Sequence, residues 1–441
     1  MAEDVPANRE SELNAKSSER QGSLVVLGLL ALLVGAASGL LGAVFRLTLD
    51  QADRFRGVLL VWAHGQEFAG LLFIVGVSAA ATGVAAWLVR RYSPQASGSG
   101  IPHVEAVLNG ELPPAPFRLI PVKFFGGLLA IGTGLALGRE GPSVQMGAGI
   151  AHLLGVVFRC SWPDCRVLLA AGAGAGLATA FSAPIAGAVF VLEELVRRFD
   201  TRITITTLGA SAGAIAVARV LLGDAPDFQV APLPSPGFGT VPIYLVQGVV
   251  AGFLGVAYNY TLLGTLAAAE RLRGWPVELR AALIGAAVGL LAWFAPDLVG
   301  GGDPITQRML VGAEALAMVA FVFIIRFGLG ALSYAAVTPG GLFAPMLVLG
   351  SQSGLLYGSL SKHWFPGVAP HPTAFAVAGM AAFFTAVVRA PVTGIVLVIE
   401  MTASFTLLLP MLGACFGAML VPTLLGNAPI YDTLRQRALQ R

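Results

Sequence analysis

The sequence predicts an all-α protein that crosses the membrane many times, and three observations point to this fold class. Hydrophobic residues make up 56% of the 441 residues and charged residues only 12%, with a mean hydropathy of +0.79. This balance is typical of polytopic membrane proteins rather than of soluble enzymes. The chain also contains runs without Asp, Glu, Lys or Arg at 21–45, 68–89, 167–192, 228–269, 327–361 and 364–388. Most of these runs are long enough to cross about 30 Å of hydrocarbon.

The third observation is an internal repeat. The pattern Ala-Pro-x-x-Gly, with a Glu six residues beyond the Gly, occurs at 183–193 and again at 390–400. Gly-x-x-x-Pro occurs at 138–142 and at 341–345, with two more glycines at equal offsets beyond each proline. Two homologous halves with Gly- and Pro-interrupted apolar segments are typical of transporters that bind substrate near the membrane midplane, between broken helices.

The repeat predicts how the chain is divided. The expected segments are a disordered cytoplasmic N-terminus at 1–22, a first transmembrane repeat at 23–220, an inter-repeat linker at 221–240, a second transmembrane repeat at 241–425 and a C-terminal helix at 426–441 that carries Tyr431. The polar start of the chain does not resemble a cleavable signal peptide, so we expect the first span to act as the targeting signal.

The first repeat opens with two long apolar helices. We expect one over 23–48, stopping near Arg46, and a second that begins after Arg54 and Arg56 and ends at the basic pair 90–91. A glycine-rich break then precedes a short helix that starts near Pro102, because proline is tolerated in the first turn of a helix. Ser99 is expected in the N-cap position of that helix.

The next span, 115–137, contains the unusual Lys123, which could place positive charge near a substrate path. A second break at 138–142 follows, and Glu140 is expected at the head of an apolar helix, at membrane depth, where a carboxylate calls for a functional reason. The later run 167–192 ends on Glu193 and Glu194. An ordinary helix end paired with the arginines that follow is the alternative reading of these two acids.

Charge and cysteine content exclude several functions. The net charge is +3, and the basic residues form small clusters in loops, which are typical of topology determinants at the cytoplasmic face and not of nucleic-acid binding. The three cysteines cannot all pair, and no Cys/His cluster has metal spacing. We therefore expect no metal and no cofactor. An intramembrane enzyme is disfavoured because no hydrolase or metalloprotease motif lies in a span.

Three segments share the Gly-x-x-x-Pro pattern, at 98–102, 138–142 and 341–345. Each is expected to place free backbone N–H groups, and roughly half a positive charge from the helix macrodipole, at a break inside the membrane. Three such helix ends that converge would bind an anion. A cation site would instead need rings of carboxylates or carbonyls, and the sequence has few buried acids.

The three segments resemble, in the same order, the signature motifs of the CLC family of chloride channels and transporters: Gly98-Ser-Gly-Ile-Pro102, Gly138-Arg-Glu-Gly-Pro142 and Gly341-Leu-Phe-Ala-Pro345. The likeness extends from about residue 25 to the final helix. It implies a fold of two inverted-topology repeats with tilted and broken helices. It also implies a homodimer with one pathway per subunit, in a bacterial inner membrane with both termini cytoplasmic.

The resemblance also implies roles for individual residues. Glu140 matches the family's gating glutamate, whose carboxylate competes with the anion until it is protonated, so that it is also the outer proton acceptor. The residues that match anion-binding positions are Ser99, Tyr431, Leu342, Phe343, Arg139 and Gly141. Isolated from this context, Ser99 would be a plain helix cap and Tyr431 an interfacial anchor.

Whether the protein is an antiporter or a channel depends on Glu194. This residue matches the glutamate that relays protons on the inner side of family antiporters, and its presence favours exchange of chloride for protons. Glu193 and Glu400 are expected to be structural residues at helix ends, and Glu105 to be exposed or structural. A passive chloride channel is the alternative, and a fluoride/proton antiporter is a weaker one. The chain stops ten residues after Tyr431, so the family's cytoplasmic regulatory domains are expected to be absent.

Overall fold

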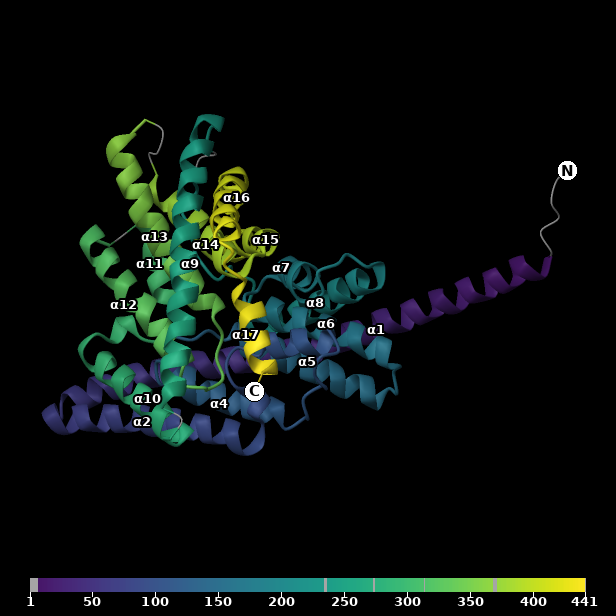
Figure 1. Cartoon of the computed structure of the whole chain (residues 1–441), viewed down its shortest axis with the longest axis horizontal. Coiled ribbons are helices and arrows are strands. Elements are labelled where there is room, and N and C mark those ends of the chain that lie inside the picture. Colours follow the sequence, from purple (N-terminus) through teal and green to yellow (C-terminus); the bar gives the residue numbers. More distant parts are fainter. Residues whose placement is uncertain (1–6, 234–235, 273, 313, 368–370, 441) are drawn as a thin grey trace.

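The computed structural model describes residues 7–233, 236–272, 274–312, 314–367 and 371–440, with side chains from Leu24 onward. Within these ranges the chain forms seventeen α-helices and two isolated β-bridges, and it contains no β-strand (Figure 1). The expected disorder at 1–22 concerns residues 1–6, which lie outside the described ranges, and residues from Ala7 on, whose backbone belongs to the first helix.

Eight helices precede residue 223 and eight more follow residue 240. The first eight are α1 (Ala7–His64), α2 (Glu67–Tyr92), α3 (Ile101–Leu108), α4 (Leu119–Gly132), α5 (Glu140–Val157), α6 (Trp162–Ala180), α7 (Pro184–Phe190) and α8 (Thr201–Leu222). The next eight are α9 (Val241–Arg271), α10 (Val277–Phe294), α11 (Asp303–Val311), α12 (Leu316–Tyr334), α13 (Phe343–Trp364), α14 (Pro372–Val388), α15 (Pro391–Thr402) and α16 (Leu408–Leu424). The last helix, α17, is Ile430–Leu439.

In the described part of the chain, six segments are long and apolar enough to cross a membrane: Leu24–His64, Glu67–Tyr92, Thr201–Leu222, Phe238–Arg271, Val277–Phe294 and Leu316–Tyr334. Other apolar helices have only 10–17 residues, for example Leu119–Gly132 and Pro391–Thr402. Because a helix rises 1.5 Å per residue, the shortest of these cannot cross about 30 Å of hydrocarbon alone. The fold therefore mixes full spans with broken helices.

The expected end of the first helix near residue 48 was wrong. Helix α1 continues to His64, because its basic residues are satisfied without leaving the helix. Arg46 donates to Asp227 over 2.7 Å, and Arg56 donates to Asp53 over 2.6 Å and to the Gly132 carbonyl over 3.0 Å. A charged residue ends an apolar run in the sequence. The helix can nevertheless continue past that residue, because an ion pair neutralises its charge.

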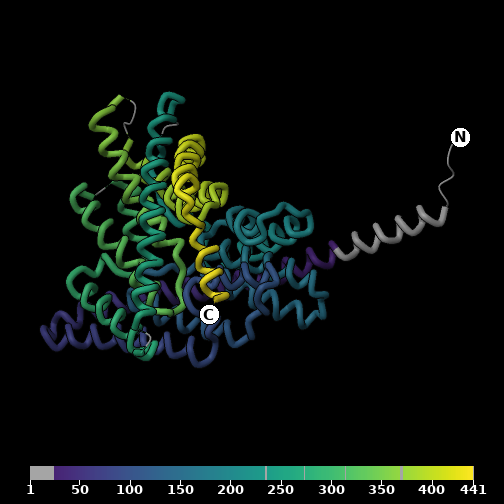
Figure 2. The backbone as a smooth tube through the Cα atoms, viewed as in Figure 1, coloured from purple at the N-terminus to yellow at the C-terminus, as the bar shows by residue number. Residues whose placement is uncertain are grey.

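The two sets of eight helices correspond in order. Helix α1 packs on α8 as α9 packs on α16, and α5 packs on α6 as α13 packs on α14. Helix α2 of the first set packs against α10 of the second. In Figures 1 and 2 most of the second set lies at the upper left and α5 to α8 lie at the right, and α17, in yellow, descends near the middle of the view.

The helix breaks also occur in pairs. The 3₁₀ turn Pro94–Ala96 precedes α3, and a second 3₁₀ turn, Pro296–Leu298, precedes α11. Gly100 and Gly302 hold the same position before these two helices, with φ of 83° and 99°. This region of φ is open to glycine and strained for other residues. A fourth Gly-x-x-x-Pro, at 300–304, is therefore the repeat counterpart of 98–102, in addition to the three segments that were expected.

Candidate functional site

The three glycine–proline breaks are joined by backbone hydrogen bonds. Gly98 forms an isolated bridge with Pro339, and the Gly340 N–H donates to the Gly98 carbonyl over 3.0 Å. Gly138 and Gly341 exchange two hydrogen bonds, of 2.9 and 2.7 Å. The expected convergence of the three helix ends is confirmed: the loop before α13 lies between the starts of α3 and α5 and contacts both.

Glu140 is fully buried at the start of α5, but its carboxylate lies at the start of another helix. The Ala344 N–H, in the first turn of α13, donates to Glu140 Oε1. Glu140 Oε2 has no hydrogen-bond partner, and a methyl group added at Gly341 would come within 2.8 Å of it. The glycines thus leave room for a negatively charged group at a helix N-terminus, where backbone N–H groups and the macrodipole favour an anion.

Ser99 and Tyr431 both present buried hydroxyls. Each side chain is 0% exposed, and neither hydroxyl has a hydrogen-bond partner. The N-cap expected at Ser99 was wrong: Gly100 occupies that position in a left-handed conformation, so the serine hydroxyl is not used to cap α3. Buried polar groups are normally hydrogen-bonded, so these two hydroxyls are candidates for contact with a ligand.

Gly141 and Phe343 lie in close contact with Ser99 and Tyr431, respectively. A methyl group at Gly141 would come within 2.5 Å of the Ser99 hydroxyl oxygen, so α5 and the 98–102 loop touch closely. The rings of Phe343 and Tyr431 stack with centroids 6.1 Å apart. Leu342 is the N-cap of α13, Phe343 is its first residue, and both are fully buried. The first amides of a helix have no acceptor within it, so they are available to a ligand.

Arg139 is placed differently from the other candidates. Its guanidinium donates to the Ala180 carbonyl over 3.0 Å and lies 3.2 Å from Asp303 and 3.7 Å from Asp227. These partners neutralise the cation and fix the loop that precedes α5. Among the atoms of Arg139, only the backbone remains as a candidate anion ligand beside Glu140.

Two buried cations mark the repeat symmetry. Lys123 lies nineteen residues before Pro142, and Arg326 lies nineteen residues before Pro345. Lys123 Nζ donates to the carbonyls of Ala96 and Gly98 over 3.0 and 2.7 Å. Arg326 Nη1 donates to the carbonyls of Leu298 and Gly300 over 3.1 and 2.7 Å. Each cation holds the loop before a broken helix, so Lys123 positions the segment that carries Ser99. Counting from the repeated prolines would have revealed Arg326.

Glu194 lies in a π-helical turn, Val191–Leu195, that follows α7. It is 2% exposed, its Oε1 has no hydrogen-bond partner, and the nearest cation is Arg197 at 3.6 Å. A π-helical turn inside a helix is frequent at functional sites, because it changes the direction in which a side chain points. The pairing with Arg197 that the alternative reading expected is present, but the distance of 3.6 Å between Arg197 Nη2 and Glu194 Oε1 is long for an ion pair.

Glu193 and Glu400 are reciprocal helix caps, as expected of structural residues. Glu193 accepts hydrogen bonds from the backbone N–H groups of Val392 and Thr393, over 3.0 and 2.6 Å, at the start of α15. Glu400 accepts from Ile185 and Ala186, over 3.0 and 2.7 Å, at the start of α7. Each repeat thereby caps a helix of the other repeat.

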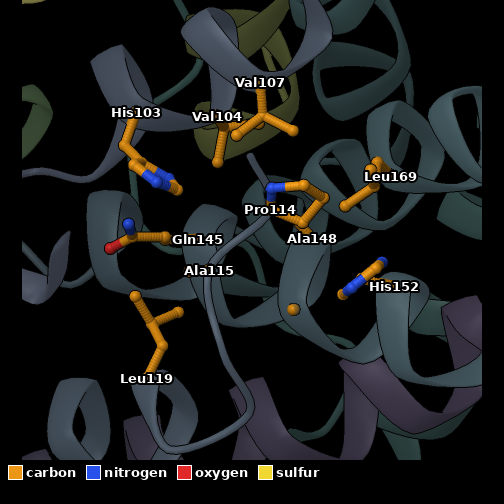
Figure 3. A pocket seen from close by; sticks show the side chains of 11 residues that line it. His103, Val104, Val107, Pro114, Ala115, Leu119, Gln145, Ala148, His152 and Leu169 are labelled. Atoms are coloured by element: carbon orange, nitrogen blue, oxygen red, sulfur yellow. The ribbon is translucent and has the colours of Figure 1, made fainter. Parts of the chain in front are cut away.

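A small cavity lies between α3 and α5. It is lined by His103, Gln145 and His152 together with apolar residues, and the two histidines lie on opposite sides of it (Figure 3). Its volume of about 20 Å³ leaves room for a single water molecule. No group of three His, Cys, Asp or Glu residues in the described part of the chain could hold a metal ion.

The fold and the site together define a class: a membrane transport protein built from two related sets of helices, whose broken helices converge on buried, unpaired hydroxyls and one buried carboxylate. A sequence profile described as "Voltage gated chloride channel" matches residues 80–423. The chain belongs to the voltage-gated chloride channel, or CLC, family.

Named relatives agree with this assignment. The chain is 38% identical to the H(+)/Cl(-) exchange transporter ClcA of Vibrio cholerae, over 93% of this chain and 89% of that protein. It is 37% identical to the transporter of the same name from Klebsiella pneumoniae, over 96% and 91%. The crystal structure of a slow cyanobacterial Cl-/H+ antiporter superposes with a TM-score of 0.90 and 32% identity, covering 94% of this chain and 98% of that one.

Proposed function

We propose that this protein is a secondary active transporter that exchanges chloride for protons. The observation that carries the proposal is the Glu140 carboxylate, which accepts a hydrogen bond from the first turn of α13. An ionised carboxylate there occupies the place of an anion, and protonation removes the charge that holds it. Opening the path to chloride and taking up a proton then become one event at one side chain.

In this proposal the central anion site lies on the inner side of Glu140. The hydroxyls of Ser99 and Tyr431 would donate to chloride, and the amides of Leu342 and Phe343 would complete its coordination. Gly141 and the backbone of Arg139 would contact a second, outer anion. The orphaned hydroxyls support this assignment because a buried O–H without an acceptor is destabilising unless a ligand pairs with it.

The inner proton relay in this proposal is Glu194, on the other side of the central site. Its Oε1 accepts no hydrogen bond and can therefore take a proton without breaking one. A cavity of about 250 Å³ reaches the neighbouring Leu195 and Val196. Two separate carboxylates, one at each end of the anion site, support coupled exchange rather than a passive channel, which needs no inner acid.

The wider features of the protein follow the same proposal. The chain forms a homodimer with one pathway in each subunit, in a bacterial inner membrane with both termini cytoplasmic. Its segments are the repeats 23–220 and 241–425, the linker 221–240 and the C-terminal segment 426–441. Arginine clusters at helix ends support the orientation, because basic residues favour the cytoplasmic side. The protein moves chloride and protons and transforms no substrate.

Parallel measurement of chloride and proton flux in the wild type and in Glu194→Gln tests this function. Liposomes containing purified protein are placed under a chloride gradient, with potassium and valinomycin setting the voltage. The wild type should move protons against chloride, and Glu194→Gln should keep chloride flux but lose proton flux by at least about tenfold, since the glutamine amide cannot accept and pass on a proton as the carboxylate does. Chloride flux without proton flux in the wild type would make the protein a channel.

A further inference from the structure

Carboxylates from three parts of the fold surround the guanidinium of Arg197. Its Nη2 lies 2.9 Å from Asp432 on α17, 3.5 Å from Glu105 on α3 and 3.6 Å from Glu194 on the π-helical turn. Glu105 is 1% exposed, so of the two expectations for this residue, exposed or structural, the structure excludes the first. One cation thus contacts both the proposed proton relay and two helices of the anion site.

Arg435 completes the connection from the other side. Its Nη1 lies 3.0 Å from Glu105, its Nη2 lies 3.4 Å from Asp432, and its Nε lies 3.7 Å from Glu111. The side chain of Arg435 is 15% exposed. We call Arg197, Arg435, Glu105 and Asp432 the inner clamp, because together they join α3 to α17.

The inner clamp lies close to both hydroxyls of the central site. Helix α3 begins two residues after Ser99, and Glu105 is about 6 Å along it. Tyr431 is the second residue of α17, and Asp432 follows it directly. Any change in how Glu105 and Asp432 are held together therefore moves Ser99 relative to Tyr431. Figure 1 shows α17 near the middle of the molecule, between α9 and the helices α5 and α6 in that view.

The charges of this region do not balance. The acids that face it are Glu105, Glu111, Glu194 and Asp432, and the bases are Arg197 and Arg435. The neighbouring Glu193 is directed to the start of α15. On α6 and α8, Arg202 pairs with Asp164, and Arg166 donates to the Leu108 carbonyl. Because there are four acids and only two bases, one of the acids can hold a proton. Glu105 Oε2 and Glu194 Oε1 also lack hydrogen-bond partners.

The backbone at Arg197 is held in an unfavourable conformation. Its φ is 55°, in the left-handed region that non-glycine residues rarely adopt, and it lies two residues after the end of the π-helical turn. Such a conformation costs on the order of 1–3 kcal/mol and persists only where the surroundings enforce it. Here the turn and the strained residue together direct Glu194 and the guanidinium of Arg197 to the same point.

We propose that the inner clamp links the protonation of Glu194 to the width of the anion site at its inner side, an inference that rests on the proposed exchange function. With Glu194 ionised, three carboxylates repel one another around a single guanidinium nitrogen. A proton on Glu194 removes one of them. Arg197 is then shared by Glu105 and Asp432 alone, α3 and α17 are drawn together, and the exit between Ser99 and Tyr431 narrows while the proton is present.

The test compares Arg435→Gln with Arg437→Gln. Arg437 lies on the same helix but pairs with Glu270, with Nη2 at 2.5 Å from Oε2, and it contacts no member of the inner clamp. Both variants are reconstituted in liposomes, and the number of chloride ions moved per proton is measured. Loss of a cation from a buried pair should raise this ratio about threefold or more in Arg435→Gln. Arg437→Gln should keep the wild-type ratio, and Arg435→Lys should restore it.

The outcomes separate the clamp from the general function. If the wild type is coupled and Arg435→Gln keeps its ratio, or if both glutamine variants uncouple equally, the clamp is refuted and the exchange function stands. If the wild type moves no protons, the exchange function itself fails. Should Arg435→Gln not fold, the double variant Glu105→Gln/Arg435→Gln removes the unpaired buried carboxylate as well and must show the same raised ratio.

Discussion

At the scale of single residues, the position of the Glu140 carboxylate matters more than the position of its backbone. The residue starts α5, yet its side chain accepts from the Ala344 N–H of α13. The carboxylate therefore competes directly with an anion for the helix end that an anion would occupy. The motif 138–142 predicts a carboxylate at a helix start. Which helix start the side chain reaches depends on the packing of two distant loops.

Glu140→Gln should keep chloride transport and lose both proton coupling and pH dependence. The amide resembles the protonated acid in shape and charge, so the gate no longer titrates. In the wild type, acidification should raise chloride flux, by up to about tenfold per pH unit, because the neutral fraction of one carboxylate changes by that factor. Chloride efflux from liposomes at acidic and neutral pH measures how chloride flux depends on pH in the wild type and in Glu140→Gln. A variant that retained the wild-type pH slope would show that another group controls the gate.

At the scale of helices, the two repeats stabilise each other through exchanged caps. Glu193 of the first repeat caps α15, and Glu400 of the second caps α7. The two acids occupy the same position in the repeated pattern, so each half of the chain makes the same capping interaction with the other half. Adjacent glutamates thus differ in role: Glu193 is directed to a helix start, whereas Glu194 is directed to the inner clamp.

Glu193→Gln should lower stability without changing coupling. Replacing a charged acceptor of two backbone N–H groups by a neutral amide should cost about 1–3 kcal/mol. A fluorescence-monitored thermal transition of the purified protein measures the loss, and Glu194→Gln serves as the matched control with little change in midpoint. Equal midpoints for Glu193→Gln and the wild type would mean that the caps contribute nothing to stability.

The sequence also predicted elements that the structure corrects, and the corrections share a cause. Arg46 and Arg56 do not end α1, because each finds a partner on a segment far away in the sequence. Gly100 rather than Ser99 precedes α3 because only the glycine adopts a φ of 83° without strain. Local patterns locate apolar runs and breaks well, but not the long-range pairs that neutralise a charge.

At the scale of the whole molecule, the repeat made the fold predictable. Duplicated motifs predict two related halves, and the three Gly-x-x-x-Pro segments predict helix ends that meet. The sequence did not predict the bridge between Gly138 and Gly341 or the inner clamp, since both depend on how the halves pack on each other. The candidate site is assembled from both repeats and α17, and none of these parts contains it alone.

The exchange of chloride for protons belongs to this scale, because the proposed gate Glu140 and the proposed relay Glu194 lie on different helical elements and neither alone can couple the two ions. The direct test is proton movement in liposomes that contain the wild-type protein and a chloride gradient, with no initial pH gradient and with the voltage clamped to zero by valinomycin and potassium. The account predicts that chloride flow drives protons uphill, in the direction opposite to chloride. Chloride movement that dissipates its gradient while the internal pH stays constant would contradict it.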